Sequence, residues 1–169
     1  HDIEGLIKLM GGKKAFSEQL QKVFDKNKFD MANEPDIAYP YLFNYIKGEE
    51  WRSQKLVKEL LKNHFKNTPD GIPGNDDTGT MSAWLVYSMM GIYPISPGET
   101  KYAITAPMFD KITIKLNRKY YKQKELVIER FGSESGIISK ILLNGKKQTS
   151  YFINHNNLVN GQSLQVIQD

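Results

Sequence analysis

The run GNDDTGTMSAW, residues 74–84, is the most informative stretch of the sequence. Two adjacent acids, Asp76 and Asp77, stand in a turn bracketed by Gly74 and Gly79. An apolar stretch follows at once, and the first turn of a helix directs unpaired backbone N–H groups toward the loop before it. Because such a turn can hold carboxylates beside a cation or a sugar hydroxyl, it is the first candidate site.

Helices are predicted throughout the first part of the chain, where apolar residues recur at helical spacing. The predicted helices cover residues 2–10, 13–26, 37–46, 51–65 and 81–90. Gly11-Gly12 and Gly48 end the first and third of them. The last helix is apolar almost all round and is expected to be buried, with core packing the default for both Trp51 and Trp84.

Strands are predicted from residue 101 onward, because the apolar period there changes from about 3.6 to about 2. The predicted strands cover residues 102–104, 112–116, 126–128, 137–143, 148–153 and 164–167. Asn144-Gly145 predicts a two-residue hairpin turn, and no helix is expected in this part. The predicted fold class is therefore α+β, with paired helices over residues 1–98 and an antiparallel β-rich segment over residues 99–169.

The amino-acid composition argues against several classes of function. The net charge of +4 is uneven: residues 1–95 carry 12 basic and 13 acidic side chains, and residues 96–169 carry 11 and 6. A basic half can indicate a nucleic-acid face, but these lysines are scattered along strands without a recognition helix, so no nucleic-acid partner is expected. The absence of cysteine excludes disulfides and thiolate metal sites. No apolar run reaches the roughly 18 residues of a membrane span, so no membrane insertion is expected.

Two loops carry the candidate chemistry, and each has two interpretations. Asp76 and Asp77 can bind calcium, activate water or bind sugar hydroxyls, or the loop is solvated and one acid caps the next helix. In the segment 33–36, Asp36 is expected to cap the following helix. Glu34 precedes a helix with four aromatic residues, and carboxylates beside aromatic faces are typical of sugar sites. The three histidines have no metal-ligand spacing.

Residues 70–84 resemble glycoside hydrolase family 92, the calcium-dependent exo-acting α-mannosidases. Further matching segments cover residues 91–94 and 106–111, together with 1–6 and 33–35, so the resemblance extends over residues 1–116 in the family's order. The family's catalytic domain is an (α/α)6 barrel preceded by a β-sandwich domain. The chain also lacks an initiator methionine. It is therefore expected to hold the last helices of the barrel and a terminal β segment, with the N-terminal remainder of the same polypeptide as its partner.

The resemblance also implies roles for individual residues. The family hydrolyses terminal α-mannosides with inversion, which requires a general acid and a separate general base. Asp77 matches the base, and Asn75 stands where many members have a second acid; an asparagine can orient water but cannot accept its proton. Asn33 and Glu34 match a pair that lines the leaving-group subsite, and Asp76 is expected to support substrate binding. The family's general acid is expected outside this chain, so the isolated chain is predicted to be inactive.

Cofactor and location are likewise implied by the family. Calcium binds near the base, which makes Asp77 the candidate metal ligand. Family members are mostly bacterial, are secreted, periplasmic or attached to the cell surface, and act on mannose-containing N-glycans. The alternative hypothesis is a non-catalytic carbohydrate-binding or interaction module that uses the aromatic helix at residues 37–46 and the basic second half.

Overall fold

The computed structural model describes residues 1–96 and 98–169, which form two compact units, His1–Leu85 and Val86–Asp169. The division falls within helix α4, Thr80–Met90. The domain boundary near residue 98 stays a prediction. The structure contains both helices and antiparallel strand pairs, as the predicted α+β class requires, whereas the barrel architecture stays a prediction.

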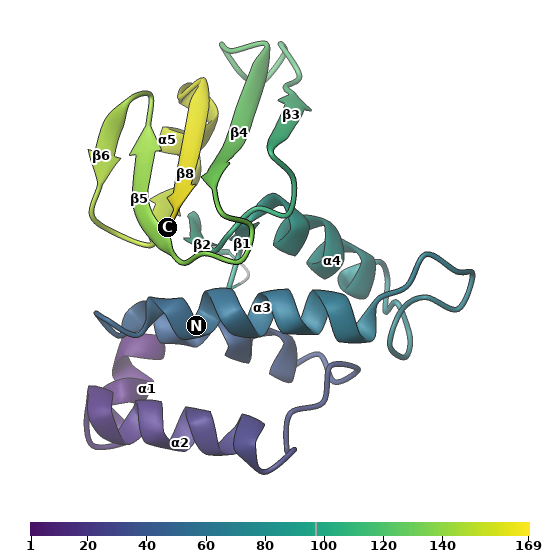
Figure 1. Cartoon of the computed structure of the whole chain (residues 1–169), viewed down its shortest axis with the longest axis vertical. Coiled ribbons are helices and arrows are strands. Elements are labelled where there is room, and N and C mark those ends of the chain that lie inside the picture. Colours follow the sequence, from purple (N-terminus) through teal and green to yellow (C-terminus); the bar gives the residue numbers. More distant parts are fainter. Residues whose placement is uncertain (97) are drawn as a thin grey trace. The chain divides into compact units, whose positions relative to one another are not determined.

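The helical unit contains the helices predicted from the apolar spacing (Figure 1). They are α1 (Ile3–Leu9), α2 (Lys13–Asp25), α3 (Glu50–His64) and the start of α4, each within one residue of its predicted bounds. Gly11 and Gly12 both adopt left-handed backbone, with φ of 91° and 99°, and end α1 where the sequence predicted. The chain then reverses into α2, which gives the expected pair of helices.

The third predicted helix is a 3₁₀ helix, η1 (Asp36–Tyr45), rather than an α-helix. Pro40 lies inside it and has no N–H to donate, and a proline also disfavours α-helical backbone at the residue before it. The aromatic residues of η1 nevertheless supply the core of this unit, because Tyr41 and Phe43 are fully buried. Helix α3 packs against η1 and buries Val57 beside it.

Two burial predictions for this region are wrong in part. Helix α4 buries Met81 and Trp84, whereas Ala83 and Val86 on another face are exposed. Its apolar composition therefore does not correspond to burial all round. Trp84 is a core residue as expected, but Trp51 is 43% exposed. The Arg52 guanidinium lies 5.5 Å from the centre of the Trp51 ring, an exposed cation–π contact rather than core packing.

The β-rich unit contains two sheets. A three-stranded sheet has the order β1-β2-β7, and a five-stranded sheet has the order β3-β4-β8-β5-β6 (Figure 1). The strands are β1 (Ile92–Tyr93), β2 (Lys101–Ile104), β3 (Lys111–Lys115), β4 (Glu125–Gly132), β5 (Ile138–Leu143), β6 (Lys146–Gln148), β7 (Phe152–Asn154) and β8 (Ser163–Gln168). Alternate residues of β4 and β8 enter the core, including Ile128 and Leu164, both fully buried.

The prediction of a purely antiparallel segment is wrong for one pair, because β4 and β8 run parallel. Strands β4 and β5 are consecutive, and β8 lies between them, antiparallel to β5. Since β4 and β5 run in opposite directions, a strand placed between them must be parallel to one of the two. Periodicity along the sequence indicates strands but not which strand is inserted between two others.

Two local predictions in this unit also need correction. The strand expected over residues 148–153 is two strands: β6 ends at Gln148 in the five-stranded sheet, and β7 pairs with β2 in the other sheet. A short helix that was not expected, α5 (His155–Asn160), lies between β7 and β8, and the Asn154 side chain caps it by accepting from the Asn156 N–H. The turn at Asn144-Gly145 is confirmed, with φ of 51° and 74° as this hairpin type requires.

A search of the described helices for one both long and apolar enough to cross a membrane finds none.

Candidate functional site

The loop before α4 is held in an unusual backbone conformation. Asp77, Thr78 and Gly79 are consecutive left-handed residues, with φ of 46°, 61° and 91°. Such backbone costs about 1–2 kcal/mol at a residue with a side chain, and aspartate is among the types that tolerate it best. The Asp77 carbonyl accepts from the Thr80 N–H at 3.2 Å and from the Thr80 hydroxyl at 2.8 Å, which closes the turn. The loop is therefore a defined structure rather than a flexible connection.

The two adjacent acids have different environments. Asp76 is half-buried, and its Oδ1 accepts from the Ser82 N–H at 2.8 Å, while its carbonyl accepts from the Met81 N–H at 3.1 Å. It therefore satisfies donors in the first turn of α4 that would otherwise lack partners. Asp77 is exposed, and among the described residues its carboxylate makes no hydrogen bond or ion pair. One acid builds the start of the helix and the other is available for chemistry.

Asn75 lies on the same loop and is also exposed. Its side-chain amide has no hydrogen-bond partner among the described residues. It is therefore available to a bound water or substrate, as Asp77 is. Its role in orienting a water molecule stays a prediction.

The loop before η1 is built around a buried carboxylate. Asp36 is 8% exposed and accepts from the Asp30 N–H at 3.0 Å and from Asn33 Nδ2 at 3.1 Å. Burial raises the pKa of the Tyr39 hydroxyl, and the negative charge of Asp36 and its hydrogen bond with that hydroxyl raise it further. The expectation that Asp36 caps the helix is wrong: Pro35 is the N-cap residue, and no side chain caps this end. Asp36 instead organises the whole loop.

Asn33 and Glu34 lie at the exposed side of this loop. The Asn33 amide N–H₂ donates to Asp36, which fixes the orientation of the side chain. The Glu34 carboxylate has no hydrogen bond or ion pair within the described part of the chain. This loop therefore repeats the arrangement of the other, with one engaged acid and one exposed acid.

The structure brings the two candidate loops together. A Cβ built on Gly74 would lie only 2.8 Å from the Cβ of Ala32, so the loops are in van der Waals contact at that point. Beneath them, the Trp84 indole N–H donates to the Ile37 carbonyl at 2.9 Å. This bond joins the first turns of α4 and η1. Loops separated by about forty residues in sequence thus meet at one place in the helical unit.

The indole ring of Trp84 is the packing centre under this place. It is fully buried, lies parallel to the Phe65 ring at a centroid distance of 5.5 Å and meets the Tyr41 ring edge-on at 6.1 Å. Such aromatic pairs add about 0.5–1.5 kcal/mol beyond the area that they bury. The positions of the two loops are therefore set by rigid core packing.

The fit to calcium is partial. Asp77 has an exposed carboxylate of the hard-oxygen type that calcium prefers. The described residues hold no group of three or more histidine, aspartate or glutamate side chains that could enclose a metal ion. Because calcium takes about 6–8 oxygen ligands, this loop offers part of a shell at most.

Comparison with known protein families decides the identity of the chain. The model of the "Glycosyl hydrolase family 92 catalytic domain" matches residues 1–167. This chain belongs to glycosyl hydrolase family 92. The match continues through the β-rich unit, beyond residue 116, where the resemblance seen in the sequence ended.

Individual relatives of known sequence or structure agree with the family. An "uncharacterized secreted glycosidase" from the fungus Arthroderma benhamiae is 34% identical over 168 residues, which are 98% of this chain and 21% of that protein. A family GH92 α-mannosidase from Bacteroides thetaiotaomicron superposes with a TM-score of 0.88 at 28% identity, covering 99% of this chain and 23% of the other. A family GH92 inverting mannosidase from the same species gives 0.85 at 29%, covering 100% and 26%.

The chain spans about a fifth to a quarter of the length of these relatives. One further structure of the first Bacteroides enzyme contains mannoimidazole, and this chain matches it with a TM-score of 0.86 at 26% identity, covering 99% of this chain and 24% of that one. The relatives come from a fungus and from a bacterium, so the expectation of a bacterial source stays a prediction.

Proposed function

We propose that the polypeptide carrying this segment is a secreted exo-acting α-mannosidase that hydrolyses terminal α-mannosides of N-glycans with inversion. Membership of family 92 supports a glycoside hydrolase, and α-mannosidases among its relatives support the sugar. The description of the fungal relative as secreted supports the location. Under this proposal, residues 1–98 are the last helices of an (α/α)6 catalytic barrel, and residues 99–169 are a C-terminal β segment.

Asp77 acts as the general base in this proposal. The observation that carries it is the exposed carboxylate of Asp77, which has no structural partner in the described chain and is held on a rigid turn. The base removes a proton from a water molecule whose oxygen attacks the anomeric carbon of mannose. The bond from that carbon to the leaving oxygen breaks, and a general acid outside these residues protonates the leaving oxygen. Attack from the opposite face inverts the anomeric configuration.

The neighbouring side chains have supporting roles. Asn75 orients the attacking water through its free amide, since it cannot accept the proton. Asn33 and Glu34 contact the leaving-group sugar, and Asp76 supports substrate binding while it holds the start of α4. If calcium is bound here, the Asp77 carboxylate would be among its ligands, and the ion would supply positive charge that attracts sugar hydroxyls.

The test replaces Asp77 by asparagine in the polypeptide that carries this segment together with the rest of the family 92 domain. Asparagine tolerates left-handed backbone, so the turn should persist. We expect kcat on an aryl α-mannoside to fall by about 10²–10⁴-fold, the usual contribution of a general base. The matched control is Asp70→Asn, an exposed acid in the preceding turn, which should retain wild-type turnover.

Product analysis by NMR checks the stereochemistry, because the first mannose released from an α-mannoside should be the β anomer. Turnover within a few-fold of wild type in the Asp77→Asn protein would show that Asp77 is not the base. It would favour the alternative in which this segment is a carbohydrate-binding or interaction module and catalysis lies elsewhere in the polypeptide.

A further inference from the structure

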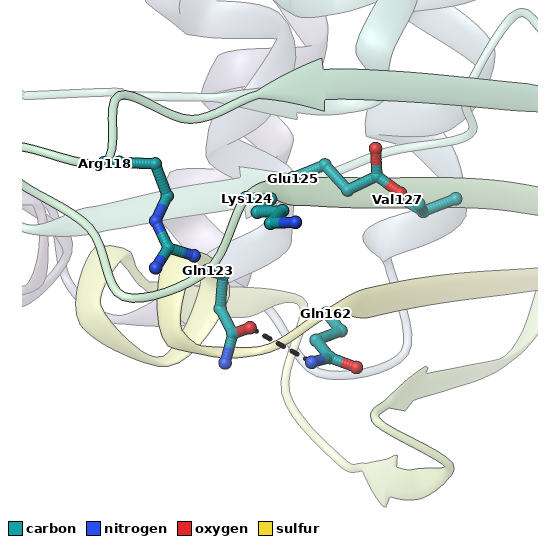
Figure 2. Close-up of a pocket in the computed structure, with 6 residues that line it drawn as sticks. All are labelled: Arg118, Gln123, Lys124, Glu125, Val127 and Gln162. Atoms are coloured by element: carbon teal, nitrogen blue, oxygen red, sulfur yellow. Dashed lines mark hydrogen bonds between the residues drawn. The ribbon is translucent and has the colours of Figure 1, made fainter.

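A polar pocket of ≈ 550 Å³ lies in the β-rich unit and contains none of the proposed catalytic residues (Figure 2). Its volume falls within the roughly 300–1,000 Å³ of small-molecule sites, but most such sites are mainly apolar. The lining comes from the β3–β4 loop, from β4 and from the turn before β8. The lining residues are Arg118, Gln123, Lys124, Glu125, Val127 and Gln162.

The pocket is held in shape by backbone and amide hydrogen bonds. Gln162 Nε2 donates to Gln123 Oε1 at 3.0 Å, the bond that joins the two amides in Figure 2. The Gln162 N–H donates to the Asn144 side chain at 2.8 Å, and its carbonyl accepts from the Val127 N–H at 3.0 Å. Two of these bonds hold the backbone of Gln162, and the third pairs its side chain with that of Gln123. The amide pair is therefore preorganised rather than two mobile surface side chains.

The β3–β4 loop, which carries Arg118 and Gln123, is also ordered. The Leu116 N–H donates to the Lys124 carbonyl at 2.8 Å and closes its two ends, and Asn117 caps its turn by accepting from the Lys119 N–H at 2.8 Å. The Tyr121 ring meets the His155 ring edge-on at 6.0 Å, which ties the loop to α5. Arg118 and Gln123 thus project from a loop that is fixed at its ends and at its centre.

The charged side chains of the pocket have no partners of their own. The Arg118 guanidinium, the Lys124 ammonium group and the Glu125 carboxylate each lack an ion pair or hydrogen bond with the described residues. Together with the amides they present donors and acceptors along the pocket, and the apolar side chain of Val127 lies at one end beside Glu125 (Figure 2). A neutral sugar ring has the matching pattern: hydroxyls that both donate and accept around its edge, and a less polar C–H face. An anion would be attracted by Arg118 and Lys124 but repelled by Glu125, whereas a neutral ligand with hydroxyls can pair with all three and with the amides.

We propose that this pocket is a second, non-catalytic binding site for a neutral glycan chain. It holds a glycan, through Arg118, Glu125 and the Gln123–Gln162 pair, independently of the residues that carry out hydrolysis. The ligand class follows from the pocket itself, whereas the choice of α-mannan as a probe rests on the proposed function.

The experiment measures retention of the full-length Asp77→Asn protein by soluble α-mannan in affinity electrophoresis, a readout that requires no turnover. The double variant Glu125→Gln/Gln162→Leu should weaken retention by about tenfold, the equivalent of one or two lost hydrogen bonds to a charged or amide group. Lys147→Ala, an exposed site on β6 outside the pocket, is the control and should leave retention unchanged. Glu125→Gln alone should show part of the loss of retention. Because glutamine has the same size as glutamate and the position is exposed, this loss would not be due to misfolding.

A second readout distinguishes failure of the binding-site proposal from failure of the hydrolase proposal. In the active protein, the double variant should lower kcat/KM on polymeric α-mannan and leave kcat/KM on an aryl α-mannoside at the wild-type value. Equal retention of all variants, or no retention of the parent, would overturn the second site. Salt-sensitive retention by dextran sulfate in place of α-mannan would also overturn it, in favour of an anion site. If turnover is absent but the retention pattern holds, the hydrolase proposal fails and the binding site stands.

Discussion

The two loops of the candidate site are each held in a defined conformation, but by different interactions. The loop before η1 is built around a buried side chain, Asp36, which gathers donors from its own loop and from Tyr39. The loop before α4 is built by left-handed backbone, and its engaged acid, Asp76, bonds only to the helix that follows. In both loops the second acid, Glu34 or Asp77, has no structural partner in the described chain. The engaged acids should therefore govern stability, and the exposed acids should govern function.

The largest stability effect should come from the buried carboxylate. Asp36→Ala leaves the Asp30 N–H, the Asn33 amide and the Tyr39 hydroxyl without their acceptor, and we expect a loss of about 2–3 kcal/mol in the free energy of unfolding. Urea denaturation followed by circular dichroism measures it. The matched variant Glu34→Ala should change stability by no more than about 0.5 kcal/mol. Similar losses for both variants would break the division between engaged and exposed acids.

The contact between the loops can be tested at Gly74. Gly74→Ala adds left-handed strain and forces its new Cβ against Ala32, and we expect a loss of about 2 kcal/mol. Gly79→Ala is the control, because its φ of 91° is equally left-handed and nothing lies within 4 Å of the new Cβ. It should lose only about 1 kcal/mol. The difference in unfolding free energy between the two variants reports the cost of pushing the loops apart; if it is zero, the loops do not depend on that contact.

A smaller effect is expected at the cap of α4. Asp76→Ala removes the acceptor of the Ser82 N–H and should cost about 1 kcal/mol, as for other helix caps. Asp77→Asn should cost less than about 0.5 kcal/mol while lowering kcat by about 10²–10⁴-fold. Thermal unfolding and an activity assay on the same two samples give both quantities. A larger stability loss at Asp77 than at Asp76 would reverse the roles assigned to the two acids.

The smallest effect concerns alkaline pH. The pKa of Tyr39 is raised in the folded protein, first by burial and then by Asp36, so folding favours the neutral hydroxyl. Its contribution to stability is complete below the unfolded pKa of about 10 and is lost as the pH rises through the raised folded pKa. Tyr39→Phe should therefore reduce the fall in stability above pH 10. Because burial also raises the pKa of Tyr102, an ultraviolet titration of tyrosinate formation should lose one of its late steps, and an unchanged titration would show that Tyr39 does not titrate there.

Helices were predicted more accurately from the sequence than the sheet. Periodic apolar residues and glycine stops are local signals, so α1 to α4 have nearly their predicted bounds. The parallel pairing of β4 with β8 arises because β8 lies between β4 and β5, and a local sequence pattern cannot predict this order. The helix over residues 37–46 was predicted without its type, and the 3₁₀ form that Pro40 favours was not anticipated.

The candidate site was predicted as two stretches of sequence, and its residues were found by residue type and by family resemblance. The role of Asp36 was missed, since its acceptor geometry depends on how residues 30–36 fold back on themselves. The contact of Gly74 with Ala32 also could not be predicted, because the two residues are far apart in the sequence. A signal was present, however: glycine is the residue used where the backbone must approach another segment closely.

Trp84 also provides a fluorescence signal from the candidate site. The chain has two tryptophans, one fully buried beneath both loops and one, Trp51, 43% exposed on α3. A collisional quencher in solution should therefore dim the emission of Trp51 and leave that of Trp84 largely intact. The residual fluorescence then reports on the indole that hydrogen-bonds to Ile37, so a sugar that shifts either loop should change its colour or intensity. The protein carries its own optical probe at the place where the two loops meet.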